Sequence, residues 1–223
     1  MGSQDGDRSR SRGRLGVQID RNLQVRIAAI SGGFPHYVHL ITEKLLWRMF
    51  GDANEVREAT RDHYRCALDD AVDSVAPQLK EPYLRATQRS SEDYRDAIWA
   101  VADAYDLQRN TSRIFESYLR ITEALEAQPF ARSKLLSILN RLKDERYGSV
   151  LKSLPDRKGW YEFRENMLRG FVRLIAEQHG IELHDQSADI PRQLTARVPH
   201  IRPRQAYRVP QAPKVRFRGE PST

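Results

Sequence analysis

His36 and His39 lie one helical turn apart, and they are the first residues in this sequence whose spacing suits chemistry. Two imidazoles so placed can supply two ligands to a metal ion, but a protein zinc site needs at least a third protein ligand. No cysteine or further histidine follows at a complementary spacing, and Glu43 is a weak candidate for completing the set. We therefore expect no metal site.

The sequence also lacks the parts that hold and hydrolyse a nucleotide. A phosphate-binding loop, Gly-x-x-x-x-Gly-Lys-Ser/Thr, exposes backbone amides to the phosphates and adds a lysine, and no such string occurs. The run Leu142-Lys143-Asp144-Glu145 ends in two acids, as a magnesium-binding strand does, but a lysine precedes them and the run has a helical period. We therefore predict that the chain is not an enzyme on its own and holds no cofactor of its own.

Polar and cationic side chains on one predicted helix, and on a turn that follows it, suggest contacts with DNA. Within residues 129–142 the apolar stripe consists of Leu135, Ile138, Leu139 and Leu142. The other faces are free for side chains that bind base edges or phosphates. The predicted contacts are Arg132, Ser133, Ser137, Asn140, Arg141, Arg157 and Lys158. The alternative is that these are ordinary solubilising charges, since Asp144 and Glu145 lie beside them.

Three amphipathic helices are expected in residues 15–89. The first ends at Ser31-Gly32-Gly33, and Pro35 suits the first turn of the second. Pro77 and Pro82 are expected to end or kink the third helix, because proline interrupts helical hydrogen bonding. Residues 15–89 are therefore predicted to form a small helical domain.

Residues 90–183 are predicted to form a second domain, which contains a β-hairpin. Three helices come first, with a break at residues 109–112 between the first two. Two strand-like runs, 150–154 and 160–164, then flank the turn Pro155-Asp156-Arg157-Lys158-Gly159, and a last amphipathic helix follows. Helix, helix, helix, hairpin, helix is the order of a winged helix, whose third helix is the usual recognition element.

The net charge of +7 is concentrated at the two ends of the chain. Residues 1–14 carry four arginines and two aspartates, and residues 182–223 carry eight lysines or arginines and four acids. We expect a disordered basic N-terminus in 1–14 and a disordered proline- and arginine-rich tail in 184–223. No apolar run is long enough to cross a bilayer, and the lone Cys66 fits a reducing compartment, so we expect a cytoplasmic protein without a membrane partner.

The run Ile27-Ala28-Ala29-Ile30-Ser31-Gly32-Gly33-Phe34-Pro35-His36-Tyr37-Val38-His39-Leu40 resembles the lid domain of bacterial AAA+ ATPases related to the origin-recognition and signal-transduction ATPases. In that family a Gly-x-Pro-x-Tyr joint begins the second lid helix, as Gly33, Pro35 and Tyr37 do here. The helix start at Thr60-Arg61-Asp62 and the winged-helix order are also similar. The resemblance covers roughly residues 14–183, and it implies a lid followed by a winged helix without the nucleotide-binding core.

The resemblance also implies a role for the start of the second lid helix. There a cationic side chain, often an arginine, senses the γ-phosphate of a nucleotide that a separate core holds. His36 stands at this position, with Gly33 and Pro35 shaping the joint, and it departs from the common arginine. A helix N-terminus attracts anions whatever its side chains. The alternative is that His36 only covers the joint.

These observations lead to two hypotheses about function. The first is a non-catalytic accessory or fragment of an AAA+ ATPase, whose winged helix binds DNA or a protein partner. The second is an ATPase subunit that completes a nucleotide site only with a core supplied by another chain or by an upstream reading frame. ATP and Mg²⁺ enter only in the second case, because this sequence has no phosphate loop.

Overall fold

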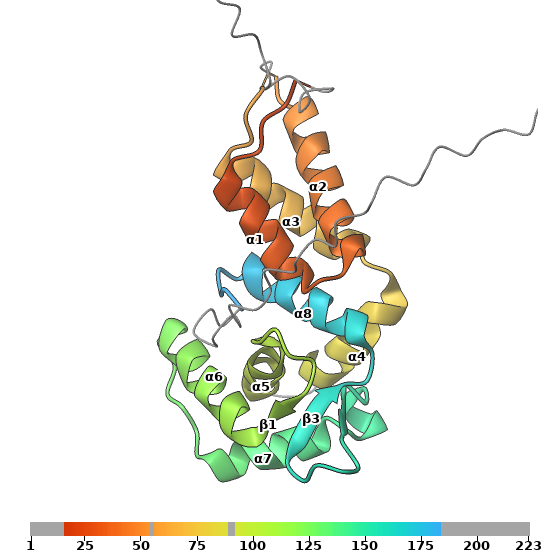
Figure 1. Cartoon of the computed structure of the whole chain (residues 1–223), viewed down its shortest axis with the longest axis vertical. Coiled ribbons are helices and arrows are strands. Elements are labelled where there is room, and N and C mark those ends of the chain that lie inside the picture. Colours follow the sequence, from red (N-terminus) through yellow and green to blue (C-terminus); the bar gives the residue numbers. More distant parts are fainter. Residues whose placement is uncertain (1–15, 54–55, 89–91, 184–223) are drawn as a thin grey trace, which may run out of the picture. The chain divides into compact units, whose positions relative to one another are not determined.

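The computed structural model describes residues 16–53, 56–88 and 92–183, which are mainly helical (Figure 1). The predicted disordered ends, 1–14 and 184–223, lie outside the described residues. The described residues contain eight α-helices, one 3₁₀ helix and three short strands, in the order α1 (Arg21–Ser31), α2 (Pro35–Phe50), α3 (Arg61–Ser74), α4 (Pro77–Gln88), α5 (Glu92–Ala102), β1 (Arg109–Asn110), α6 (Thr111–Ala124), α7 (Arg132–Arg141), η1 (Glu145–Tyr147), β2 (Leu151–Ser153), β3 (Trp160–Phe163) and α8 (Asn166–Gln178).

The first three helices begin and end at residues that suit helix termini. The Asp20 carboxylate accepts a hydrogen bond from the Asn22 N–H, at 3.1 Å, and so caps α1. Gly32 follows the last residue of α1 with a φ of 59°, a left-handed conformation that glycine adopts at low cost. The Thr60 hydroxyl accepts from the His63 N–H at 3.2 Å at the start of α3. The predicted end of the first helix at residues 31–33 is thus confirmed.

The third helix ends shortly before Pro77, as predicted, but the stretch that follows forms a helix of its own, which corrects the prediction for Pro82. α3 already ends at Ser74, and Pro77 is the first residue of α4, where a missing N–H costs little. Pro82 lies inside α4. A Cβ on Gly148 would clash with the Pro82 carbonyl, so the close approach of α4 to the end of η1 requires a glycine there.

The three strands form an antiparallel sheet in the order β1-β3-β2. Leu151 of β2 lies opposite Phe163 of β3, and both side chains are buried. The predicted hairpin is therefore confirmed. The predicted break at residues 109–112 is partly wrong, because Arg109 pairs with Tyr161 and adds β1 to the far edge of β3.

The last helix, α8, contacts α1, α3, α4 and α5. Its Arg169 and Arg173 are almost fully buried. Arg173 donates to the carbonyls of Ala29 in α1 (2.8 Å) and Ala102 in α5 (2.9 Å), and Arg169 donates to the carbonyl of Gly32 (3.0 Å). Burial and the neighbouring Arg169 lower the pKa of Arg173 to about 10. α8 thus ties the end of α1 to the end of α5.

The buried apolar side chains of the two predicted domains, 15–89 and 90–183, belong to one continuous cluster. Tyr37 of α2 and Phe171 of α8 are among its largest members. The division into two domains at residue 89 stays a prediction. No helix of the described part of the chain is both long enough and apolar enough to cross a membrane.

Candidate functional site

The exposed side of α7 carries the polar side chains that the sequence analysis selected. The predicted apolar stripe of α7 and of the next residue, Leu142, is buried in the core. Ser133, Ser137, Asn140 and Arg141 are exposed, and no acidic residue occurs within α7. We call these four residues, together with Arg157 and Lys158 on the β2–β3 turn, the α7 surface.

Two side chains of the α7 surface are held by tyrosine hydroxyls. A guanidinium N–H of Arg141 donates to the Tyr94 hydroxyl at 3.2 Å, and Asn140 accepts from the Tyr161 hydroxyl at 3.4 Å. Tyr94 in turn stacks on Tyr147, with ring centroids 5.2 Å apart. The bond to Tyr94 raises the pKa of Arg141. Both candidate base-contacting groups are therefore partly oriented before any ligand arrives, which lowers the entropy cost of binding.

The predicted contact Arg132 is engaged elsewhere. Its guanidinium donates to the Ser112 hydroxyl at 2.8 Å, at the start of α6. The neighbouring Lys134 pairs with Asp93 at 2.5 Å and lies over the Phe130 ring. Of the three cations of α7, Arg141 is thus the one that is paired with no carboxylate or serine among the described residues.

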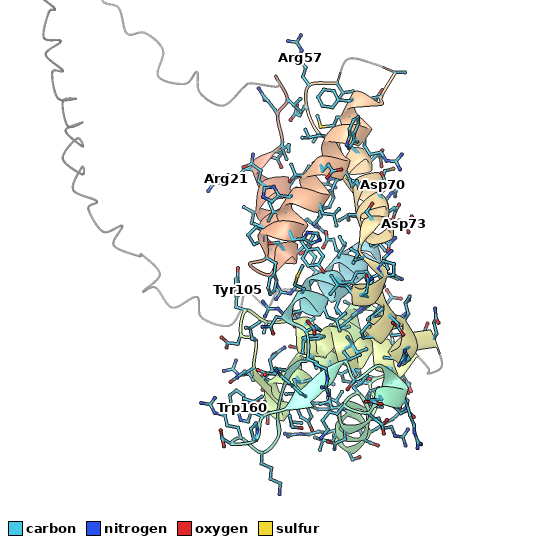
Figure 2. The ribbon with its side chains drawn as sticks, turned by 90° about the vertical axis from the view of Figure 1, so that its right-hand side faces the viewer. Arg21, Arg57, Asp70, Asp73, Tyr105 and Trp160 are labelled. Atoms are coloured by element: carbon cyan, nitrogen blue, oxygen red, sulfur yellow. The ribbon has the colours of Figure 1, made fainter. Side chains whose placement is uncertain are left out.

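The β2–β3 turn presents its two predicted cations differently. The Arg157 guanidinium lies over the Trp160 ring, 5.1 Å from its centroid, a cation–π contact that restricts the side chain. Lys158 is exposed. Figure 2 labels Trp160, which lies at the end of the sheet that carries this turn. A cation on a partly fixed side chain and a second, exposed one suit contacts with phosphates, which need charge more than exact geometry.

Lys143 is a further cation near the α7 surface that the sequence analysis did not select. Its ammonium lies 3.0 Å from the Ser153 hydroxyl and 5.9 Å from the Tyr161 ring centroid, so it bridges the end of α7 and the hairpin. The following Asp144 and Glu145 obscured this signal in the sequence. Asp144 caps η1, because its carboxylate accepts from the Arg146 N–H at 2.9 Å.

The joint between α1 and α2 is shaped by glycine and by a buried tyrosine. Gly33 has a φ of 88°, and Pro35 is the first residue of α2. The Tyr37 hydroxyl donates to the Met167 carbonyl at 2.8 Å, and burial raises the pKa of Tyr37 to about 12. A Cβ on Gly170 would clash with the Tyr37 ring, so this glycine of α8 gives the ring its place. The joint is thereby held against α8.

His36 is exposed on the first turn of α2, with its ring at an edge-to-face angle to Tyr37 (centroids 5.2 Å apart). The first turn of α2 has no side-chain cap. α2 contacts α1 and α3, whereas α7 contacts α5 and α6, so the joint and the α7 surface belong to different parts of the fold (Figure 1). The structure therefore offers two candidate sites and not one.

Neither candidate site contains a metal centre. In residues 16–53, 56–88 and 92–183, no group of three or more His, Cys, Asp or Glu side chains is arranged to hold a metal ion. Comparison of the chain with protein-family models, with curated proteins and with solved structures gave no match. The proposals below therefore rest on the geometry and chemistry of this chain and on the resemblance of residues 27–40 to an AAA+ lid.

Proposed function

We propose that the chain is a non-catalytic accessory module of the AAA+ ATPase type, in which residues 92–183 act as a winged helix that binds duplex DNA. The observation that carries this proposal is the exposed side of α7, which has amide, hydroxyl and guanidinium groups and no acid. Such groups can contact both base edges and phosphates in a major groove.

The arrangement around α7 also supports the proposal. Two features are typical of winged helices. One is the element order, which is α5, β1, α6, α7, β2, β3, α8, and the other is a hairpin whose turn carries Arg157 and Lys158. In this arrangement α7 is the recognition helix and the β2–β3 turn is the wing. The apolar stripe of α7 anchors it on the core, so the polar side chains project from a rigid support.

A fluorescence-anisotropy titration on duplexes of varied sequence, at several salt concentrations, tests DNA binding. The double variant Asn140→Ala/Arg141→Ala should lose sequence preference, because bidentate contacts to base edges discriminate between bases. Its dependence on salt should change little, since most phosphate contacts remain. The matched control is Arg21→Ala/Asn22→Ala, which removes an exposed arginine and asparagine from α1 and should leave the preference unchanged.

Two results would contradict the DNA proposal. If the wild-type chain binds no duplex at low salt, α7 is not a DNA-binding helix, and the same exposed surface is to be tested for protein partners. If both double variants weaken binding to every duplex equally, the binding is non-specific and comes from overall charge.

A second candidate function comes from the uncapped start of α2. Backbone N–H groups in the first turn of a helix attract anions; in α2, Pro35 has no N–H and the Tyr37 N–H donates to the Phe34 carbonyl at 3.1 Å, which leaves the N–H of the exposed His36 for an anion. We infer that an ATPase core in another chain would present its nucleotide phosphates here. The chain alone should release no phosphate from MgATP, and a core encoded upstream should hydrolyse MgATP faster with wild-type chain than with His36→Ala. Equal rates would exclude the role for His36.

A further inference from the structure

A cavity of about 680 Å³ lies where the first turns of α1 and α3 meet the end of α8. The segments that precede the two helices run in parallel and are joined at Gln18 and Glu58, so α1 and α3 start side by side. Three exposed arginines line the cavity, Arg21 of α1 and Arg61 and Arg65 of α3. In Figure 2, Arg21 projects from α1 away from the body of the ribbon. We call these three residues the arginine rim.

The arginine rim is only partly neutralised. Within the described residues, neither Arg21 nor Arg61 has an ion-pair partner. Arg65 has a long pair of 3.7 Å with Asp62, and an exposed pair of this kind contributes little. Asp20 also lines the cavity, and its carboxylate caps α1. The rim therefore has two guanidinium groups that no carboxylate of the described residues holds.

Arginine is an unfavourable residue at the start of these helices. Arg21 and Arg61 are the first residues of α1 and α3, and the N-terminal end of a helix carries a partial positive charge. A cation there is destabilising through the same effect that makes an acid stabilising. Because the fold gains nothing from the charges of Arg21 and Arg61, a bound anion that neutralises them stabilises this end of the molecule.

The carboxylates at the inner end of the cavity are already engaged. Glu177 Oε1 pairs with the Nε of Arg26 and accepts from the Tyr64 hydroxyl at 3.2 Å, while its Oε2 is buried. Glu182 pairs with Arg26 at 2.8 Å and has a further interaction. Arg26 is therefore held by two carboxylates and is not free for an anion, so an anion in this cavity binds at the arginine rim.

One helical turn beyond the rim, the lining of the cavity is apolar. Val25 follows Arg21 by four residues on α1, and Leu68 follows Arg65 by three residues on α3, so each lies on the same side of its helix as the arginine. The Val25 side chain is 55% exposed. An apolar group that covers it is removed from water together with it, which favours binding. The cavity thus joins a cationic end to an apolar wall.

We propose that the cavity binds a phosphate monoester of a small apolar alcohol, with the phosphate at the arginine rim and the apolar group against Val25 and Leu68. A phosphate monoester has three terminal oxygens and close to two negative charges, which match three guanidinium groups better than a carboxylate does. The cavity volume is within the range of small-molecule sites in proteins. The site shares no residue with the α7 surface or with His36, so it is independent of the proposed functions.

Titration calorimetry of the full chain with four matched compounds tests the proposal. Hexyl phosphate carries both groups, methyl phosphate lacks the apolar chain, heptanoate has a carboxylate in place of the phosphate, and hexanol has no charge. Hexyl phosphate should bind with a stoichiometry near one. Methyl phosphate and heptanoate should each bind at least about tenfold more weakly, and hexanol should give no measurable heat.

Variants assign the two ends of the ligand. Arg21→Gln/Arg61→Gln should weaken hexyl phosphate and methyl phosphate alike, by at least about tenfold. Val25→Thr keeps the side-chain volume but adds a hydroxyl, so it should weaken hexyl phosphate by about threefold and leave methyl phosphate unchanged. The matched control Arg113→Gln/Arg146→Gln removes two exposed arginines outside the cavity and should change neither. All five side chains are exposed, and circular dichroism checks that each variant is folded.

A phosphate monoester also occurs as the headgroup of phosphatidic acid, so sedimentation with vesicles of phosphatidylcholine and phosphatidic acid distinguishes the two sources. If the ligand is a soluble ester, hexyl phosphate gives heat and the rim variant sediments with the vesicles to the same extent as the wild type. Sedimentation that depends on the rim, without heat from hexyl phosphate, would replace the soluble ligand with a lipid and overturn the proposal.

Three further outcomes would overturn the proposal. In the first, hexyl phosphate gives no heat at millimolar concentration. In the second, methyl phosphate or heptanoate binds the wild-type chain as tightly as hexyl phosphate, so the cavity does not recognise the apolar chain or the phosphate. In the third, the Arg113→Gln/Arg146→Gln control weakens binding as much as the rim variant does, so the phosphate binds non-specifically to surface charge.

Discussion

Arg169 and Arg173 on α8 are buried and donate to backbone carbonyls, whereas Arg141 and Arg157 of the α7 surface are exposed and contact aromatic side chains. The buried pair satisfies carbonyls at the C-terminal ends of α1 and α5, where helices leave acceptors unpaired and carry partial negative charge. The exposed pair makes no hydrogen bond to a backbone carbonyl among the described residues. The same residue type therefore stabilises the structure in one place and is available to a partner in the other.

This contrast shows why net charge is a poor guide to binding. Among the described residues, three arginines, Arg109, Arg169 and Arg173, are buried and donate to backbone carbonyls, and others, such as Arg48 with Asp70, form ion pairs on the surface. What marks the α7 surface is not an excess of arginine. It is the tyrosine hydroxyls that orient Asn140 and Arg141, since α1 lacks carboxylates as α7 does.

The largest effect on stability is expected from Arg173→Met, which removes one of the two buried arginines of α8. Methionine fills a similar volume but removes the guanidinium hydrogen bonds to the carbonyls of Ala29 and Ala102, each of which keeps one backbone donor, the N–H of Gly32 and of Ala104 respectively. Each buried hydrogen bond from a charged group contributes about 1.5–3 kcal/mol, so the free energy of unfolding should fall by about 3 kcal/mol or more. Urea denaturation followed by circular dichroism measures the loss.

Arg164→Met is the matched control for Arg173→Met. Arg164 also donates to a carbonyl, that of Ser149 at 3.2 Å, but it is exposed, and water can replace it. Its replacement should leave the unfolding midpoint nearly unchanged. If both variants lower the free energy of unfolding equally, burial does not determine how much these hydrogen bonds stabilise the fold. The buried arginines of α8 and the exposed arginines would then not differ in their contribution to stability.

A smaller loss is expected from Gly170→Ala, which presses α8 away from the α1–α2 joint. The added methyl group meets the Tyr37 ring, and overpacking of this kind costs about 1–3 kcal/mol. The double variant Gly170→Ala/Tyr37→Leu should lose less stability than the sum of the two single variants, because leucine leaves room for the methyl group. Additive losses in urea denaturation would show that Gly170 and Tyr37 are not coupled.

Local patterns predicted the candidate site better than they predicted what supports it. The stripe of Leu135, Ile138, Leu139 and Leu142 and the hairpin turn are encoded within a few residues, so the exposed side of α7 could be identified from the sequence. The hydroxyls of Tyr94 and Tyr161 that orient Arg141 and Asn140 come from residues 47 and 21 positions away. No periodicity reveals such contacts.

The elements that the sequence analysis missed depend on distant partners in the same way. β1 has two residues and exists because β3, about 50 positions later, pairs with it. In the sequence, the arginines of α8 look like the exposed polar face of an amphipathic helix. In the structure, α1 and α5 pack on that face and bury them. Pro77 fits a first helical turn, and the sequence analysis missed α4 because it judged Pro77 and Pro82 only as helix breakers.

The double variant Arg157→Ala/Lys158→Ala, on the β2–β3 turn, tests whether the exposed cations of the α7 surface are available to a partner. If these cations bind phosphates, the slope of log affinity against log salt should flatten by about 0.9 for each phosphate that the variant no longer neutralises. Sequence preference should stay, because neither residue lies on α7. Anisotropy titrations at several salt concentrations measure the slope. A slope equal to that of the wild type would remove the turn from the interface.

The smallest effect is expected from Tyr94→Phe, which removes the hydroxyl that holds Arg141 and changes no group that would contact DNA. The ring still stacks on Tyr147, so the fold should be unaffected. Freeing one long side chain costs ordering entropy on binding, which corresponds to a loss of affinity of about threefold for the preferred duplex. The loss should appear only while Arg141 is present, so Tyr94→Phe should have no effect in the Arg141→Ala background, as anisotropy titrations of the four proteins can test. Equal losses in both backgrounds would mean that Tyr94 acts on binding by another route and that the α7 surface is not oriented by its hydroxyl.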